Sequence, residues 1–191
     1  MNFDDAWYPD SQIVYLKQAA TDVLSLKGHI LEIGSWKGKS TIAIAEVVRP
    51  LMVHAIDTWK GSIDESPNHA TIKMAEQEDI RSIFFSNVRE SGLNNIKMHQ
   101  MDWRLFFATE VDVLHYGVKF IHIDASHDYI SVYDNIYAVL PYMVVGGIIC
   151  GDDILSANIT RGDLQGGVER AVRELCPGFI AIENFWRWTK S

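Results

Sequence analysis

LEIGSWKGKS, residues 31–40, decides the fold, because an apolar run ends there in a glycine turn that leads into a helical pattern. A nucleotide-triphosphate loop would need G-x-x-x-x-G-K-[ST], and position 33, five before Gly38, is not a glycine. The dinucleotide motif G-x-G-x-x-G is missing as well, since position 36 is a tryptophan. What remains is Glu-x-Gly-x-x-x-Gly. In this loop Gly34 would let the backbone approach a ligand, and Gly38 would permit the turn into the helix.

Apolar runs and helical patterns alternate along the rest of the chain. Residues 179–190 fit a hairpin of two short strands. Strands that alternate with helices form a parallel sheet covered on both faces. We therefore expect an α/β fold with a doubly wound, Rossmann-like sheet that is mostly parallel and has an antiparallel C-terminal strand. The expected helices cover residues 11–27, 40–48, 70–90, 129–143 and 166–175, and the expected strands cover residues 29–34, 51–57, 96–102, 118–124 and 146–153.

No composition shift or linker divides the chain, and we expect residues 1–191 to form one α/β domain. Residues 1–27 would be its N-terminal helix region. Residues 58–90, a polar loop and the helix after it, would lie on the substrate side as a lid or wall. Trp59 begins this loop, and core packing could claim it equally well.

The composition narrows the class of protein. The 191 residues carry a net charge of -8 without a basic stripe, which argues against nucleic acid as a partner. No apolar run reaches the ~20 residues of a membrane helix, and the acidic, aromatic start does not fit a signal peptide. Cys150 and Cys176 are the two cysteines, and they indicate free thiols in a reducing compartment. We expect a soluble, cytoplasmic protein without a membrane partner.

Acidic side chains stand where the first two strands end. Glu32 suits a positively charged ligand better than a phosphate. Asp57 ends the second strand, 25 residues after Glu32. An acid at that point commonly accepts hydrogen bonds from ribose hydroxyls, so the pair predicts a nucleoside-containing ligand.

Three further carboxylates follow the fourth and fifth strands. Asp124 ends one strand, and Asp152 and Asp153 end its neighbour, so the three should converge at one edge of the sheet. They would repel one another unless a cation neutralised them, and an all-oxygen set suits Mg²⁺ or Ca²⁺. His127 lies three residues beyond Asp124, beside this predicted metal. Since histidine is a good general base near neutral pH, we predict that role for it.

The remaining histidines have structural interpretations. His54 and His122 lie within strands and are predicted to face a helix from the sheet. His69, His99 and His115 are predicted to lie in loops or on strand surfaces.

LEIGSWKGKS followed by HAID resembles the cofactor loop of class I S-adenosylmethionine-dependent methyltransferases. The likeness is greatest to the metal-dependent small-molecule O-methyltransferases, among them catechol O-methyltransferase and the bacterial macrocin and novobiocin type enzymes. It covers roughly residues 28–175. In the catechol enzyme an acid is followed 28 residues later by an Asp-Asn pair, as Asp124 is followed here by Asp152 and Asp153. Related antibiotic-tailoring enzymes carry a histidine in D-x-x-H, the position of His127.

The resemblance implies a role for each matching residue. Glu32 would face the amino group of the methionine part of the cofactor, and Asp57 would bind the ribose. Asp102 would lie near the adenine or cap a helix that begins at Trp103, and Met101 is a second-rank candidate beside it. The implied cofactor-binding residues are Glu32, Gly34, Trp36, Gly38, Ser40, Asp57, Thr58, Asp102 and Asp124, and the implied metal ligands are Asp124, Asp152 and Asp153, with His127 as the catalytic base.

We therefore predict an S-adenosylmethionine-dependent O-methyltransferase, assisted by Mg²⁺ or Ca²⁺, that acts on a small-molecule hydroxyl such as a catechol, a phenol or a sugar-like diol. A homo-oligomer is plausible, because a partner subunit could complete the pocket. The alternative is a non-catalytic cofactor-binding or interaction subunit with the same fold, against which the retained acids and His127 count. A hydroxylase-like metal protein is a more distant alternative. Asp153 is predicted to be dispensable, because Asp124 and Asp152 alone match the carboxylates of the catechol pattern.

Overall fold

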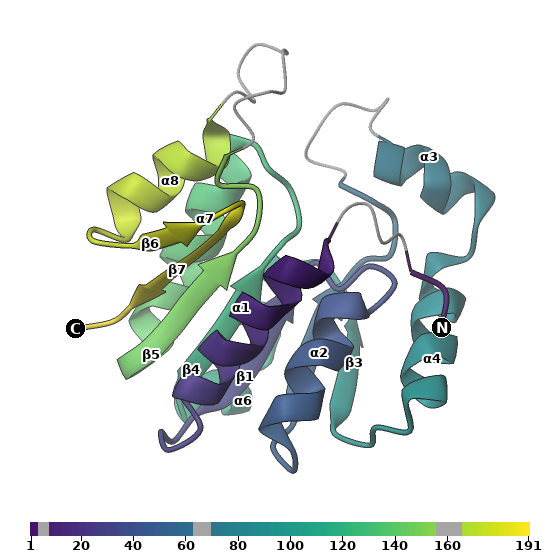
Figure 1. Ribbon diagram of the computed structural model, residues 1–191, viewed down its shortest axis with the longest axis horizontal. Coiled ribbons are helices and arrows are strands. Elements are labelled where there is room, and N and C mark those ends of the chain that lie inside the picture. Colours follow the sequence, from purple (N-terminus) through teal and green to yellow (C-terminus); the bar gives the residue numbers. More distant parts are fainter. Residues whose placement is uncertain (4–7, 63–69, 156–165) are drawn as a thin grey trace.

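A computed structural model describes residues 1–3, 8–62, 70–155 and 166–191 and contains a seven-stranded sheet with the strand order β3-β2-β1-β4-β5-β7-β6 (Figure 1). The first five strands run parallel, and β7 lies antiparallel between β5 and β6. This confirms the predicted mostly parallel, doubly wound sheet. The strands are β1 (His29–Ile33), β2 (Val53–Asp57), β3 (Ile96–Gln100), β4 (Val118–Ile123), β5 (Met143–Gly151), β6 (Ile180–Ile182) and β7 (Phe185–Thr189).

Helices cover both faces of the sheet. On one face α1 (Asp10–Asp22), α2 (Lys39–Val48) and α4 (Ile80–Ser91) bury side chains such as Leu16, Ile44 and Phe84. The other face is covered by α5 (Trp103–Thr109), α6 (Val111–His115), α7 (Tyr129–Val139) and α8 (Gly167–Leu175), which contribute Phe106, Ile136 and Val172 to the core. The remaining described elements are α3 (Ala70–Gln77) and a short 3-10 helix, Leu140–Tyr142.

Four helical predictions differ from the structure. The helix expected over residues 129–143 ends at Val139, and Met143 already belongs to β5. The N-terminal helix ends at Asp22 instead of running to position 27. The single helix expected over residues 70–90 is divided into α3 and α4, because Asp79 caps the start of α4 by accepting a hydrogen bond from the Ser82 backbone N–H at 3.0 Å. Helices α5 and α6 were not predicted as a pair. Residues 63–69 of the expected lid or wall lie outside the described residues.

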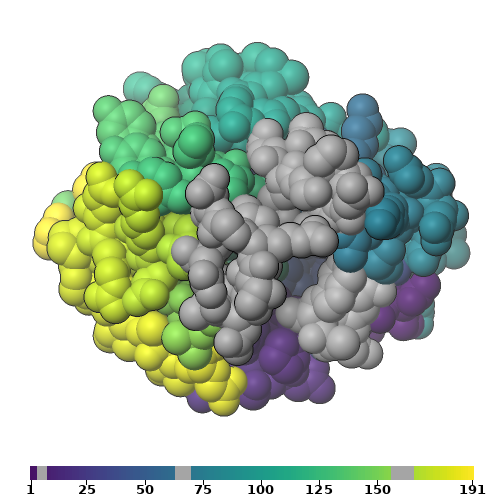
Figure 2. All heavy atoms as spheres, turned by 90° about the horizontal axis from the view of Figure 1, so that it is seen from above, coloured from purple at the N-terminus to yellow at the C-terminus, as the bar shows by residue number. Residues whose placement is uncertain are grey.

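The carboxyl ends of the parallel strands β1, β2, β4 and β5 meet at one edge of the sheet (Figure 1). Viewed onto this edge, the molecule shows the N-terminal segment, α3 and α8 arranged around it (Figure 2). None of the helices in the described ranges is long and apolar enough to cross a membrane.

Candidate active site

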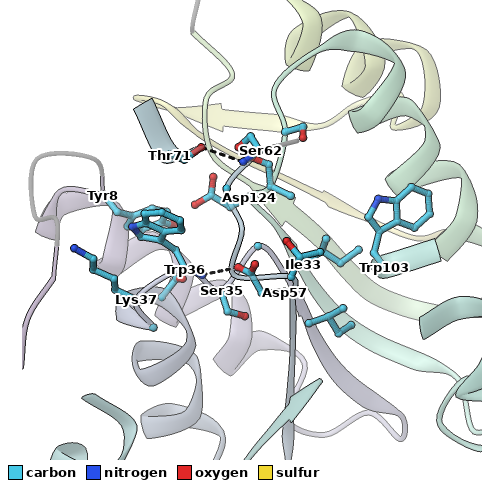
Figure 3. Close-up of a pocket in the computed structure, with 18 of the residues that line it drawn as sticks. Tyr8, Ile33, Ser35, Trp36, Lys37, Asp57, Ser62, Thr71, Trp103 and Asp124 are labelled. Carbon is cyan, nitrogen blue, oxygen red and sulfur yellow. Dashed lines mark hydrogen bonds between the residues drawn. The ribbon is translucent and has the colours of Figure 1, made fainter. Parts of the chain in front are cut away.

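A cavity of about 400 Å³ opens at this edge of the sheet (Figure 3). This volume lies in the range of roughly 300–1,000 Å³ that is usual for small-molecule sites. The loops after β1, β2, β3 and β4 supply most of its wall, and Phe3, Tyr8, Thr71 and Asp153 complete it. Of the predicted cofactor-binding residues, those that line the cavity are Gly34, Trp36, Gly38, Ser40, Asp57, Thr58, Asp102 and Asp124.

The two glycines of the loop after β1 are required for different structural reasons. Gly34 has a φ of 88°, and a Cβ added to it would lie 2.0 Å from the backbone oxygen of Asp124. The protein's own backbone therefore requires this glycine, because the loops after β1 and β4 cross there. Gly38 has a φ of 90° and is the N-cap of α2, as the sequence predicted.

Asp57 is held at the end of β2 by backbone N–H groups from two loops. Its Oδ2 accepts from Trp36 at 2.8 Å, and its Oδ1 accepts from Trp59 at 2.6 Å. Both tryptophans have a left-handed backbone, with φ values of 44° and 56°. Burial raises the pKa of Asp57, although the N–H donors of Trp59, Trp36 and Ser35 oppose that shift. A carboxylate offers about four acceptor positions, so oxygen lone pairs remain for hydroxyl donors in the cavity.

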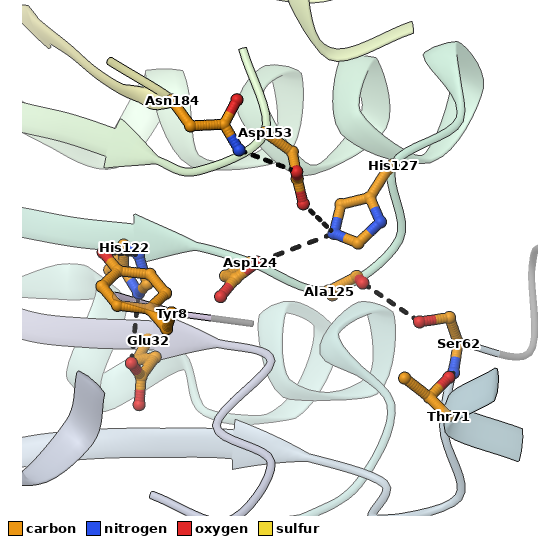
Figure 4. A network of polar contacts seen from close by, with 10 residues as sticks. All are labelled: Tyr8, Glu32, Ser62, Thr71, His122, Asp124, Ala125, His127, Asp153 and Asn184. Atoms are coloured by element: carbon orange, nitrogen blue, oxygen red, sulfur yellow. Dashed lines mark hydrogen bonds and ion pairs between the residues drawn. The ribbon is translucent and has the colours of Figure 1, made fainter. Parts of the chain in front are cut away.

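Glu32 is a correction to the sequence analysis. It is completely buried and does not belong to the cavity wall. Its Oε2 accepts the hydroxyl of Thr41, and its Oε1 lies 3.1 Å from Nδ1 of His122. The second ring nitrogen of His122 lies 3.3 Å from the hydroxyl of Tyr8, which does line the cavity (Figure 4). A direct contact between Glu32 and a ligand does not fit this geometry, because strand β1 turns the carboxylate into the protein.

Asp102 takes one of the two roles that the sequence left open, the cap of a helix. It lines the cavity, and its Oδ1 caps α5 by accepting the backbone N–H of Arg104 at 2.8 Å. Met101 and Trp103 flank it in the cavity wall. Ser35 was missed. It is 2% exposed, lines the cavity, and its hydroxyl has no hydrogen-bond partner among the described residues.

Two carboxylates and one imidazole form a cluster at the ends of β4 and β5. His127 Nε2 lies 3.0 Å from Oδ2 of Asp153 and 3.6 Å from Oδ1 of Asp124, and one donor atom from each residue lies within 4.8 Å of the others. Burial raises the pKa of Asp124, but the hydrogen bond from His127 and the charges of His122 and His127 outweigh it, so that pKa lies below its ordinary value. The arrangement fits a divalent cation.

Asp153 owes its position to the C-terminal hairpin. Its φ of 61° is left-handed, and its Oδ1 accepts a hydrogen bond from Nδ2 of Asn184 at 3.0 Å (Figure 4). Asn184 lies in the turn between β6 and β7 and also binds the backbone N–H groups of Ile154 and Leu155, at 3.1 and 2.9 Å. For this segment the sequence predicted only the hairpin over residues 179–190.

Asp152, a predicted metal ligand, lies outside this cluster. It is 5% exposed, lies outside the cavity wall, and its Oδ1 has no hydrogen-bond partner within the described parts of the chain. Burial, followed by the charges of Asp124 and Asp153, raises its pKa to about 8. The cluster that could hold a cation therefore contains Asp153 and His127 in place of Asp152. The two carboxylates of this cluster, Asp124 and Asp153, suit Mn²⁺ as well as the expected Mg²⁺ or Ca²⁺, and His127 lies beside them.

A buried pair of histidines lies away from the cavity. Nδ1 of His54 is 3.0 Å from Nε2 of His99, and the ring of Phe106 from α5 covers both. His54 faces a helix, as predicted, whereas His99 is 4% exposed instead of lying on the surface. Burial, followed by His99, His29 and Lys97, lowers the pKa of His54 to about 3. His69 lies outside the described residues.

A family model described as a methyltransferase domain matches residues 31–154. Solved structures with a similar fold include an O-methyltransferase from Bacillus cereus in complex with SAH, at 18% identity and a TM-score of 0.67, which covers 94% of this chain and 81% of that one. Another is the O-methyltransferase TomG from Streptomyces achromogenes, involved in tomaymycin synthesis and in complex with SAM, at 15% identity and a TM-score of 0.67, with 95% and 80% covered. Among curated proteins, none matches the sequence significantly. At these identities the structures establish the fold.

Proposed function

The chain belongs to the methyltransferase domain family, and from that premise we propose that it transfers the methyl group of S-adenosylmethionine to a hydroxyl oxygen of a small molecule, beside a divalent cation. The observation that carries this proposal is the position of Asp124, His127 and Asp153 in the same cavity as Asp57 and the loop after β1. Cofactor binding needs neither His127 nor Asp153, whereas the activation of an acceptor hydroxyl can use both.

The cavity offers a place for each part of the cofactor. Asp57 would accept hydrogen bonds from the ribose hydroxyls, and Met101, Asp102 and Trp103 would flank the adenine. The methionine part would then extend toward Ser40 and Asp124. With this order the sulfonium methyl group would lie near the acidic cluster.

The acidic cluster provides the acceptor chemistry. Asp124 and Asp153 would hold a divalent cation, which lowers the pKa of a hydroxyl bound to it. His127 is the one histidine among the described residues of the cavity wall, and we assign its Nε2 as the base that takes the acceptor proton. General-base catalysis of this kind contributes about 100- to 10,000-fold. The sulfonium is already an activated donor, so no protein nucleophile is needed.

The test is a methylation assay with a panel of catechols, phenolic acids and sugars, followed by product mass. We expect turnover with Mg²⁺ or Mn²⁺ and none with EDTA. In place of the dispensable Asp153 that the catechol pattern predicted, we expect a large loss in Asp153→Ala, because Asp153 lies in the cluster with Asp124 and His127. His127→Ala should slow turnover and still bind the cation, which separates a base from a ligand. Full activity in EDTA would refute the role of the cation. Binding of S-adenosylhomocysteine without any cation binding or turnover would favour the non-catalytic alternative.

We also infer a reducing, cytoplasmic location, which two buried free thiols, Cys150 and Cys176, support. A homo-oligomer stays a prediction.

A further inference from the structure

We propose that Ser62 is a positioning residue for the cation site, because its hydroxyl holds the loop that carries Asp124 and His127. The inference rests on the proposed function, since it takes a divalent cation as the occupant of the acidic cluster. Ser62 lies between β2 and α3 and lines the cavity (Figure 3). Its Oγ lies 3.2 Å from the backbone oxygen of Ala125, the residue that follows Asp124 (Figure 4).

The direction of this hydrogen bond is set by its acceptor. A backbone carbonyl oxygen can only accept, so the hydroxyl of Ser62 is the donor. A peptide unit is planar, and a bond to the oxygen of Ala125 therefore restrains the whole peptide plane between Ala125 and Ser126. The chain passes through this plane on its way from Asp124 to His127, which are three residues apart. The bond thus acts on the separation of their two side chains.

Other contacts hold the two ends of the same loop. At its start, the backbone N–H of Asp124 donates to the oxygen of Ile33 in β1 at 2.9 Å. At its end, Gly167 of α8 packs so closely on the backbone of His127 that an added Cβ would lie 2.6 Å from the His127 oxygen. The hydrogen bond from Ser62 restrains the part of the loop between these two ends.

Ser62 is itself fixed against the first turn of α3. Its backbone N–H donates to Oγ1 of Thr71 at 3.0 Å (Figure 3). Gly61 has a φ of 80°, and a Cβ added to it would lie 2.6 Å from the backbone nitrogen of Ile72, so this segment is in direct contact with α3. Ser62 therefore connects α3 with the loop after β4.

The charges of the cluster explain why such a restraint matters. Two carboxylates that share a site repel each other, and repulsion between Asp124 and Asp153 would drive a loosely held loop away from β5. In the cluster, one donor atom from each of the three residues lies within 4.8 Å of the others. A set of donors binds an ion more tightly when the protein keeps it in this arrangement beforehand. The hydroxyl of Ser62 helps to keep it.

The test is the binding of Mn²⁺, measured by electron paramagnetic resonance without any acceptor substrate. Ser62→Ala should weaken Mn²⁺ binding about 10-fold, as the loss of a group that supports metal ligands typically does. Ser62→Thr keeps the hydroxyl and should restore most of the affinity. Ser86→Ala, at an exposed serine of α4, is the matched control and should bind Mn²⁺ as the wild type does.

Calorimetry with S-adenosylhomocysteine probes the other part of the cavity in the same variants. Ser62→Ala should lose far less affinity for this ligand than for Mn²⁺, because Asp57 and the loop after β1 are held by bonds of their own. An equal loss for both ligands would mean that Ser62 supports the cavity as a whole. Its role would then be only structural, and the inference would be overturned.

The remaining outcomes separate this inference from the proposed function. If the wild type binds S-adenosylhomocysteine but no Mn²⁺, the cation part of the proposed function fails and this inference fails with it. If the wild type binds Mn²⁺ and Ser62→Ala binds it equally well, the proposed function stands and the inference alone is wrong. The same conclusion follows if Ser62→Thr binds Mn²⁺ as weakly as Ser62→Ala.

Discussion

The buried histidine pair makes stability depend on pH in a way that one substitution should reveal. The pKa of His54 is about 3 in the folded protein and about 6.5 in an unfolded chain. Above pH 6.5 both states are neutral at this residue. As the pH falls below 6.5, the unfolded chain binds a proton that the folded protein does not, so stability is lost progressively down to about pH 3. At about 1.4 kcal/mol per pH unit, His54 alone costs about 2 kcal/mol at pH 5.

Glutamine at position 54 does not titrate, and its amide can form a hydrogen bond with Nε2 of His99. The His54→Gln protein should be less stable than wild type at pH 7.5, but it should lose about 2 kcal/mol less between pH 7.5 and pH 5. Urea unfolding at several pH values, followed by tryptophan fluorescence in EDTA, gives these free energies. His115→Gln, at an exposed histidine, is the control and should run parallel to wild type. Parallel curves for His54→Gln and wild type would refute the reasoning.

Three further substitutions test the site. Gly34→Ala should lower the free energy of unfolding by about 3 kcal/mol. The left-handed φ would cost alanine about 1–2 kcal/mol, and its Cβ would overpack against Asp124 at a cost of about 1–3 kcal/mol. An unchanged melting temperature would contradict this. Asn184→Ala should weaken Mn²⁺ binding about 10- to 100-fold by releasing the turn at Asp153, with exposed Asn94→Ala as its control in the same titration. Asp57→Ala should weaken S-adenosylhomocysteine at least about 10-fold in calorimetry, and equal affinity would remove Asp57 from the cofactor site.

The succession of strands and the acidic edge could be predicted because they depend on local patterns. Apolar runs fix the strands, and parallel strands bring their carboxyl ends to one edge whatever the details of packing. Asp57, Asp124 and the Asp152–Asp153 pair therefore stand at that edge without any knowledge of side-chain contacts.

The direction in which individual acids point could not be predicted. Strand β1 is buried on both faces, so the alternation of polar and apolar residues that would orient Glu32 is missing. The choice between Asp152 and Asp153 depends on a left-handed turn and on Asn184, which is 31 residues away in the sequence. No sequence pattern identifies Tyr8 as a residue of the cavity wall, because nothing in the sequence links the N-terminal segment to β4. Ser35 lay within the quoted loop and could have been named as a hydroxyl facing the ligand.

The support of Asp153 by Asn184 has a consequence for the order in which this protein is made. Synthesis proceeds from the N-terminus, so Asp124, His127 and Asp153 leave the ribosome before the turn between β6 and β7 exists. The cation cluster thus stays unfinished until the last strands join the sheet. A nascent chain that already carries these donors lacks the turn that positions Asp153, so the geometry that selects the ion belongs to the finished fold.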